Sequence, residues 1–407
     1  MIFKRNFFKK VFVVCLGLIF ALTLSTGIIL AEEEIPLGVL TSLTGPLGPQ
    51  GQPVYDSIQM TVADINAAGG PLGQPIKIFA ADTSTDVEKG IMGMRKLVTT
   101  NRVATVIGPC SPIVLALYDY AKSNQVPIIS QWSGTTELNE IGGDYQFRTC
   151  PSDFFEGYVC AKFVSEKGYQ RVGLIVLNDE DLMSIGDGFS QQYKKLTGNE
   201  IVAKVVVNPD QTTYRSELRE IYRENPDLLF VALDFDTAVV ALKERYAADY
   251  PGDVLLASNP VSIELIDLAR EAVEGVYGEV PAAPKGTEAY SIFAMKYRSF
   301  TGREPDIFTW NAYDAVNLFA LAIEAGGEAS GVAVSENLHK VANPPGIVVH
   351  TFAQGAAHLR MGQDINYDGA AGPVDFDEFG NTGGSSAIQE VQDGQWVEIA
   401  RVTIEVG

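Results

Sequence analysis

Two short segments of the chain carry polar groups that could hold a charged ligand. The first is Pro109-Cys110-Ser111, which follows a predicted strand over residues 103–108 and begins a predicted helix over residues 111–124. Ser111 is therefore expected to cap that helix, and the free backbone N–H groups beside it can hold a carboxylate. The alternative is that Ser111 only caps its own helix.

The second segment is Gln131-Trp132-Ser133-Gly134-Thr135-Thr136, which follows a predicted strand over residues 126–130. It combines hydroxyl groups, a glycine that allows close backbone approach, and an aromatic side chain. Trp132 could line a pocket or pack beneath it. Ligands of open α/β sheets sit outside the carboxyl ends of the strands, so both segments are expected to line one cleft.

The elements that would position these segments alternate along the chain. Residues 35–41 predict a strand, and the helix that follows has one apolar face formed by Val54, Ile58, Val62 and Ile65. Strand-like and helix-like runs then alternate at intervals of about 25–30 residues, which is typical of βαβ units and a parallel sheet. Further strands are predicted at 76–80, 171–177, 201–207, 228–233 and 254–257, and helices at 87–100, 185–196, 214–224, 288–300 and 310–325. Residues 374–406 change to short alternating runs with turn signals, which indicates antiparallel strands.

The first 31 residues predict an export signal. Four basic residues precede an apolar run over residues 11–24, and small residues lead to a plausible cut after Ala31. The alternative is a retained membrane anchor. Removing residues 1–31 takes away four of the 30 Lys and Arg residues and none of the 51 Asp and Glu residues, which leaves a net charge of −25. Such a surface repels phosphate backbones and argues against binding to nucleic acid.

The mature length and the cysteines bound the architecture. About 376 residues are too many for one ordinary core and fit two domains. The mature chain keeps Cys110, Cys150 and Cys160, which permit one disulfide at most, and their spacing does not say which pair would form.

No motif of catalysis or of cofactor binding stands out, so we predict neither an enzyme nor a cofactor. Gly186-Asp187-Gly188 lacks the third glycine of a dinucleotide site, and the chain has no P-loop and no GxSxG elbow. The three histidines lack the spacing of a zinc site. The sequence leaves open a calcium loop, because Asp364, Asn366 and Asp368 match its opening and Asp375 falls at its twelfth position.

Seven motifs in order give the mature chain a family resemblance. They are LTGPLGPQG with DINAAGG, IKIFAADTSTD, VIGPCS, VPIISQWSGTTEL, YQFRTCPSD, WNAYDAV and GAAGPVDFDEFGN. With them the chain resembles type I periplasmic substrate-binding proteins of ABC importers, in the branched-chain amino-acid class. The resemblance implies two doubly wound parallel-sheet lobes joined by three hinge segments. Lobe one would comprise residues 32–150 and 281–371, and lobe two residues 151–280 and 372–407. Proline interrupts the pattern near each of these breaks.

The resemblance also implies a function and a site. The chain would be an exported receptor, periplasmic or at the cell surface and tethered if the signal is kept, that closes on a small polar ligand and presents it to a membrane permease. The ligand would be an amino acid, and the alternatives are an amide, an aromatic acid, or a sensory module of the same fold. By position the ligand residues would be Ser111, Trp132, Ser133, Gly134, Thr135, Asp234 and Phe308. The acid that holds the ammonium group in such relatives is replaced by Ser258-Asn259, which leaves Asp234 as a substitute or as an ordinary helix-entry residue.

Overall fold

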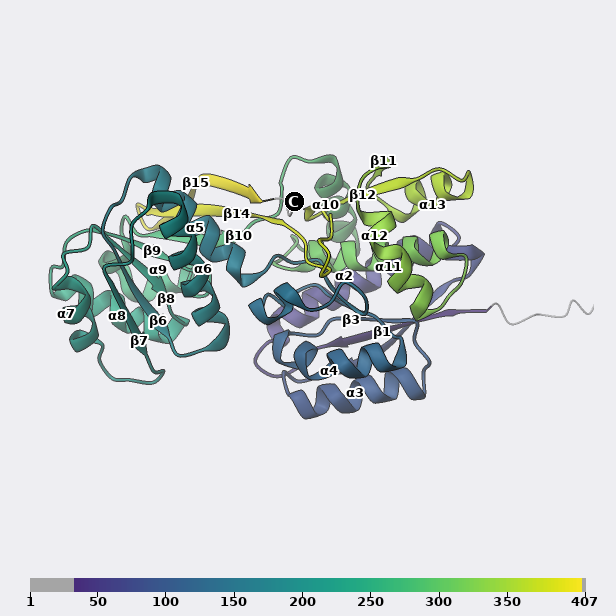
Figure 1. Ribbon diagram of the computed structural model, residues 1–407, viewed down its shortest axis with the longest axis horizontal. Coiled ribbons are helices and arrows are strands. Elements are labelled where there is room, and N and C mark those ends of the chain that lie inside the picture. The colour runs from purple at the N-terminus through teal and green to yellow at the C-terminus, as the bar shows by residue number, and fades with distance from the viewer. Residues whose placement is uncertain (1–32, 405–407) are drawn as a thin grey trace, which may run out of the picture. The chain divides into compact units, whose positions relative to one another are not determined.

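A computed structural model describes residues 33–404, so the predicted signal at residues 1–31 lies outside the described part of the chain. From Ile35 onward the chain forms one unit that is built on two large sheets (Figure 1). We call the part around the five-stranded sheet the first lobe and the part around the seven-stranded sheet the second lobe.

The five strands of the first lobe are parallel and have the order β2-β1-β3-β4-β5. They are β1 (Ile35–Thr41), β2 (Ile76–Asp82), β3 (Thr105–Ile107), β4 (Ile128–Ser130) and β5 (Gln146–Arg148). Helices cover both faces of this sheet, because Leu37 and Val39 of β1 pack with one set of helices and Leu40 with the other. Alternate residues of a strand point to opposite faces, so such a sheet reads as a nearly continuous apolar run.

Two groups of helices cover this sheet. One face packs against α2 (Gly48–Ala67) and α11 (Thr309–Gly326), and the other against α3 (Val87–Thr99) and α4 (Ser111–Asn124). The apolar face predicted for α2 is confirmed, since its four residues are buried in the core. The lobe is completed by α10 (Glu288–Thr301), α12 (Gly331–Ala342), α13 (Phe352–Arg360), the short helices η1 (Pro71–Gly73) and η2 (Thr136–Glu140), and a small sheet of β11 (Ile347–Val349), β12 (Ile365–Gly369) and β13 (Gly372–Pro373).

The second lobe has the strand order β15-β14-β10-β9-β8-β6-β7. Strands β6 (Val172–Leu177), β7 (Ala203–Val207), β8 (Leu228–Ala232), β9 (Asp253–Leu256) and β10 (Tyr277–Pro281) are parallel, and β14 (Gly384–Gln392) and β15 (Gln395–Ile404) add an antiparallel hairpin. The hairpin turns at Asp393 and Gly394, which both have positive φ, as a two-residue turn of this kind requires. The helices are α5 (Asp153–Lys167), α6 (Glu180–Thr197), α7 (Arg215–Tyr222), α8 (Phe235–Ala247), α9 (Ile263–Ala269) and the short η3 (Arg270–Val273).

These two sheets confirm the predicted fold class, an α/β protein with doubly wound parallel-sheet lobes. The predicted antiparallel tail is confirmed as well. Helix α6 starts five residues earlier than the apolar pattern predicts, because the Asp179 side chain accepts hydrogen bonds from the backbone N–H groups of Asp181 and Leu182.

Three segments connect the lobes, and the division at residues 150, 281 and 371 stays a prediction. The first connection joins β5 to α5 and the second joins β10 to α10. The third lies between β13 and β14, and its first residues belong with the first lobe, because Val374 and Phe376 are buried in that lobe's core. This packing favours a third crossing about ten residues after the predicted boundary.

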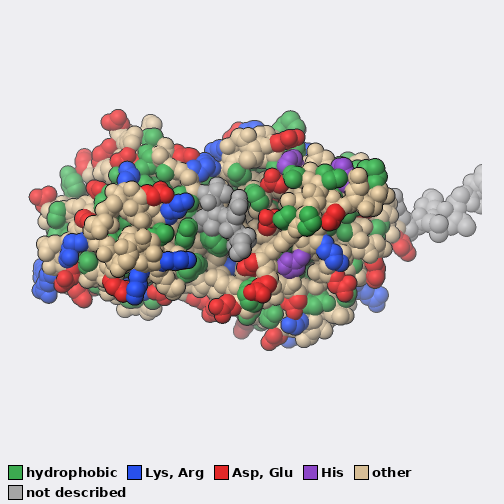
Figure 2. Space-filling model, turned by 45° about the horizontal axis from the view of Figure 1, so that its top comes forward, with side chains coloured by type: hydrophobic (Ala, Val, Ile, Leu, Met, Phe, Trp, Pro, Cys, Tyr) green, Lys and Arg blue, Asp and Glu red, His purple; other side chains and the backbone are tan. Residues whose placement is uncertain are grey.

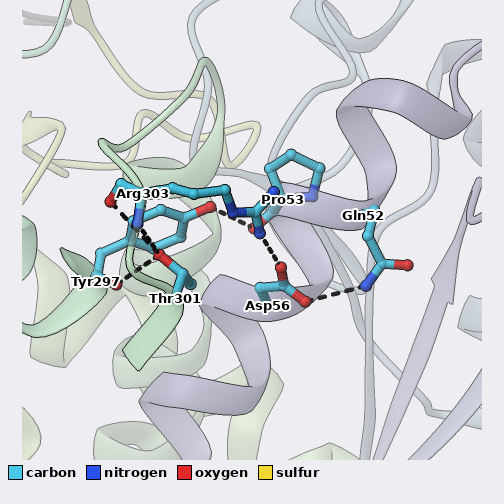
Figure 3. Close-up of polar contacts among 6 residues, drawn as sticks. All are labelled: Gln52, Pro53, Asp56, Tyr297, Thr301 and Arg303. Carbon is cyan, nitrogen blue, oxygen red and sulfur yellow. Dashed lines mark hydrogen bonds and ion pairs between the residues drawn. The ribbon is translucent and has the colours of Figure 1, made fainter. Parts of the chain in front are cut away.

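After the second crossing the chain returns to the first lobe and docks on α2 (Figure 3). Arg303 forms an ion pair with Asp56, which also accepts a hydrogen bond from Gln52 Nε2 at 3.0 Å. The Tyr297 hydroxyl donates to the Pro53 carbonyl at 3.3 Å. These contacts fix the end of α10 against the first half of α2.

The surface and the cysteines add three observations. Acidic and basic side chains are intermingled over the face drawn in Figure 2. Within residues 33–404 no single helix is long and apolar enough to cross a membrane, and only α11 and α12 together, bent by 104°, pass on length and composition. Cys110, Cys150 and Cys160 are buried and unpaired.

Candidate functional site

The start of α4 lies at the carboxyl end of β3, as predicted, but its cap is one residue earlier. Cys110 is the N-cap residue, and Ser111 is the first residue of the helix. The prediction that Ser111 caps α4 is therefore wrong. Instead, the buried Ser111 hydroxyl accepts a hydrogen bond from the backbone N–H of Thr135 at 3.4 Å. This bond brings together the two segments that the sequence singled out.

The loop after β4 is held from below by its own hydroxyl groups. Ser133 donates from Oγ to the Pro109 carbonyl at 2.7 Å, and Ser130 donates to the same carbonyl at 2.8 Å. The Ser130 hydroxyl in turn accepts from the backbone N–H of Ser133 at 3.0 Å. The Ser133 side chain therefore ties the loop to the α4 start, and its predicted role in binding ligand stays a prediction.

Arg148 supports the same loop and was missed by the sequence reasoning. Its guanidinium donates from Nη1 to the carbonyls of Ser133, at 3.2 Å, and Thr135, at 3.0 Å, and from Nη2 to Asn139. Arg148 is 1% exposed, and this burial lowers its pKa. Since its donors point at neutral acceptors, the side chain shapes the loop and forms no ion pair there.

The first lobe and the second lobe touch at this loop. Thr135 Oγ1 donates to Glu180 Oε1 at 3.3 Å, and the hydroxyls of Thr136 and Ser184 are 2.9 Å apart. The backbone N–H of Asp153, the first residue of α5, donates to the Gly134 carbonyl at 2.7 Å. Gly134 has no room for a side chain, because a Cβ there would lie 1.8 Å from Asp153 Oδ1. The structure therefore places Gly134 and Thr135 where the two lobes meet.

Trp132 and Phe308 form an aromatic pair beside the loop. Their ring centroids are 6.4 Å apart, with planes at 79°, which is an edge-to-face arrangement. Trp132 is 8% exposed and packs with Cys110 and Ile113 in the first lobe, yet its Nε1 has no hydrogen-bond partner. Phe308 has φ +64°, a strained value for a side chain of this size, at the residue before α11. The structure thus brings together two of the predicted ligand residues. Whether either ring touches a ligand stays a prediction.

Carboxyl groups line the opposite side of this meeting point. We call Asp153, Glu156, Asp181 and Glu279 the acidic wall. Burial raises the pKa of Asp153 well above its usual range, and the neighbouring Asp181 and Glu156 raise it further. Burial likewise raises the pKa of Glu279, with Glu156 beside it as the next cause. Burial also raises the pKa of Glu156. The two hydrogen bonds that Ser258 donates to its carboxylate act in the opposite direction.

Asp234 lies apart from these groups as a helix cap. Its Oδ1 accepts from the backbone N–H of Thr237 at 2.9 Å at the start of α8. This hydrogen bond is the ordinary role of a helix-entry aspartate. No contact joins Asp234 to the loop after β4, so its predicted ligand role remains a prediction.

The other candidate sites find little support. Asp364 to Asp368 do not form a calcium loop, because Ile365–Gly369 is strand β12, and residues 33–404 contain no cluster of three or more His, Cys, Asp or Glu side chains that could hold a metal ion. Two surface hollows of about 490 and 430 Å³ lie near α9 and η3, around Asp267, Arg270 and Glu271. They are open to solvent and share no residue with the loop after β4.

Comparison with known proteins places this chain among binding proteins. The model of the periplasmic binding protein family matches residues 34–395. The Leu/Ile/Val-binding protein BraC3 of Rhizobium johnstonii is 23% identical over 308 residues, which are 74% of this chain and 82% of that protein. A leucine-, isoleucine-, valine-, threonine- and alanine-binding protein of Pseudomonas aeruginosa is 24% identical over 76% of this chain and 83% of that protein.

Solved structures show the same fold. The leucine-binding protein LivK of Thermotoga maritima superposes with a TM-score of 0.72 at 21% identity, over 90% of this chain and 98% of that one. A solute-binding protein of an ABC transporter from R. palustris, solved with benzoate, gives 0.69 at 16% identity over 92% and 98%.

Proposed function

The chain belongs to the periplasmic binding protein family, and we propose that it is the exported receptor of an ABC importer, which closes on a small amino acid. The family consists of substrate-binding proteins rather than enzymes, and its members work outside the cytoplasm. The partner of the closed form would be a membrane permease.

The main support for an amino-acid ligand is the opposite polarity of the two sides of the site. The first lobe presents the N-terminus of α4 and the Ser111 hydroxyl, which accepts one hydrogen bond and can still donate one, and both suit a carboxylate. The second lobe presents carboxyl groups, of which Asp153 and Glu180 contact that loop. A zwitterion with its carboxylate toward the first lobe and its ammonium toward the second would satisfy both sides.

The named ligands of the relatives agree with this assignment and leave one competitor. Two curated relatives are named for branched-chain amino acids, and one solved neighbour binds benzoate. An aromatic acid is the second candidate, because the Trp132–Phe308 pair with its unpartnered indole N–H could receive a ring. Such a ligand would leave the carboxyl groups of the second lobe without a cation.

The proposal is tested by thermal shift with the twenty amino acids, benzoate and 4-hydroxybenzoate, followed by calorimetry on the best ligand. We expect an amino acid to give the largest shift and to reduce the radius of gyration in small-angle scattering, since bilobal proteins close by hinge motion. A response to the aromatic acids alone would replace the amino-acid assignment, and no response to any of them would count against the function.

A further inference from the structure

Glu156 is a half-buried acid at the start of α5 in the second lobe. It lies in the first turn of α5, one helical turn after Asp153, so both acids share one side of the helix. Its Oε1 accepts from the backbone N–H of Ser258 at 2.6 Å, and its Oε2 accepts from the Ser258 hydroxyl at 3.0 Å. Ser258 follows β9, so this carboxylate sits at the carboxyl edge of the second sheet, where ligands of such sheets bind.

The acidic wall brings four carboxyl groups together without a matching cation among the described residues. Arg148 is the cation that acts on Asp153, but its Nη1 and Nη2 atoms donate to neutral acceptors of the first lobe. The ion pairs described within residues 33–404 include none of the four acids. A buried carboxyl group without a cation avoids the cost of its charge by staying protonated, and an ammonium group beside it would favour the ionised form.

A second observation points to a missing cationic partner. Glu279 on β10 is fully buried, and neither of its carboxyl oxygens makes a hydrogen bond of ordinary geometry, although the Ser386 hydroxyl and the Glu156 carboxyl lie close enough to shift its pKa. Its strongest charged neighbour is Glu156, toward which it faces. A buried polar group that is left unsatisfied is rare in folded proteins and calls for an explanation. A cation between this pair and the first lobe would supply one.

We propose that Glu156, held by Ser258 and backed by Glu279, receives the ammonium group of the ligand. This inference rests on the proposed function and specifies it, because it makes the ligand an amino acid and excludes solutes without an amino group. It also places the ammonium at Glu156 rather than at Asp234, whose carboxylate is engaged in capping α8. Asp153, which contacts Gly134 in the first lobe, lies between the two ends of the ligand.

The test is a comparison of two ligands in four proteins. L-leucine and 4-methylpentanoate share a carbon skeleton and a carboxylate, and only L-leucine has the ammonium group. Calorimetry is done on the wild-type mature chain, on Glu156→Gln, on Glu156→Asp and on Glu264→Gln. Glu264 is an exposed acid on α9 of the same lobe, so its variant removes the same charge away from the site.

We expect Glu156→Gln to weaken L-leucine binding by at least tenfold and to remove most of the preference over 4-methylpentanoate. Glu156→Asp keeps the charge and should lose less, and Glu264→Gln should bind as wild type does. Glutamine can keep both contacts to Ser258 and relieves the repulsion with Glu279, so the melting temperature of the ligand-free variant should stay equal or rise. A purely structural role would lower the melting temperature and leave the ratio of the two affinities unchanged.

Two results overturn the inference, and they can be told apart. If the wild type prefers L-leucine and Glu156→Gln keeps that preference, the ammonium lies elsewhere and the proposed function stands. If the wild type binds 4-methylpentanoate as well as L-leucine, no ammonium site exists and the amino-acid assignment fails with it.

Discussion

Replacing Gly134 by alanine should weaken ligand binding at the point where the lobes meet. The new Cβ would lie 1.8 Å from Asp153 Oδ1 and 2.5 Å from its Cγ, whereas ordinary contacts begin near 3.4 Å. The Asp153 carboxyl would therefore have to retreat by about 1.6 Å, the difference between the first and last of these distances. It cannot simply follow its helix away, because its backbone N–H is bonded to the Gly134 carbonyl at 2.7 Å.

The cost of such overpacking is typically about 1–3 kcal/mol. If it falls on the closed form alone, the dissociation constant of the ligand should rise by about five- to 150-fold. Calorimetry with the best amino acid measures this change, and thermal unfolding of the ligand-free protein checks that the fold is kept.

A control and a rescue sharpen the experiment. In Gly186→Ala, a helix glycine gains a Cβ at an ordinary 3.4 Å from Val176, so affinity should not change. In a chain that already carries Asp153→Ala, adding Gly134→Ala should cost little more, because the obstructing carboxyl is gone. Wild-type affinity in Gly134→Ala, or an equal loss in the Asp153→Ala background, would refute the reasoning.

Three further predictions concern single residues. Asp234→Asn should leave the affinity for amino acids unchanged and lower stability by at most about 1 kcal/mol, since the asparagine still caps α8; calorimetry and urea unfolding measure both. Ser111→Ala and Thr135→Val should each weaken binding by about 1.5–3 kcal/mol if they hold a charged ligand group, and calorimetry with wild-type affinity in both would mean that the pocket lies elsewhere. Asp314 is a buried residue of α11 that accepts hydrogen bonds from the Tyr367 hydroxyl and from two backbone N–H groups. Burial raises its pKa to about 7, above its unfolded value, so its contribution to stability is present below about pH 4 and is lost by up to about 4 kcal/mol as the pH rises to 7. Urea unfolding of Asp314→Asn should show a flatter pH dependence in that window.

The parts of this molecule that local pattern determines were predictable from the sequence. Helix α4 is bounded as predicted, because a buried strand, a proline and an apolar period mark its start. Strand β10 was not predicted, because Gly278 and Pro281 dilute its apolar run. Its place is fixed instead by pairing with β9 and with β14, more than a hundred residues later.

The site was only half predictable for a related reason. The hydroxyls and the glycine of the loop after β4 identify it as a candidate in the sequence. The Ser133 hydroxyl, however, donates to the Pro109 carbonyl, 24 residues earlier, which local pattern does not predict. Glu156 meets Glu279 and Ser258 only after the chain has crossed between the lobes. One signal was available, since Asp153 and Glu156 stand three residues apart in the first turn after the proline-marked break at Pro151.

In our proposal, Glu156 takes the place of the acid that the resemblance leads one to expect near Ser258. A side chain that binds an ammonium group must reach the carboxyl edge of the sheet, and either a residue of the loop after β9 or one from α5 can reach it. Here serine leaves the position open, and its backbone N–H and hydroxyl orient Glu156 into it. The carboxylate then stands beside Glu279 on β10, the strand that leads into the second crossing, so a bound cation would lower the repulsion at the base of that crossing.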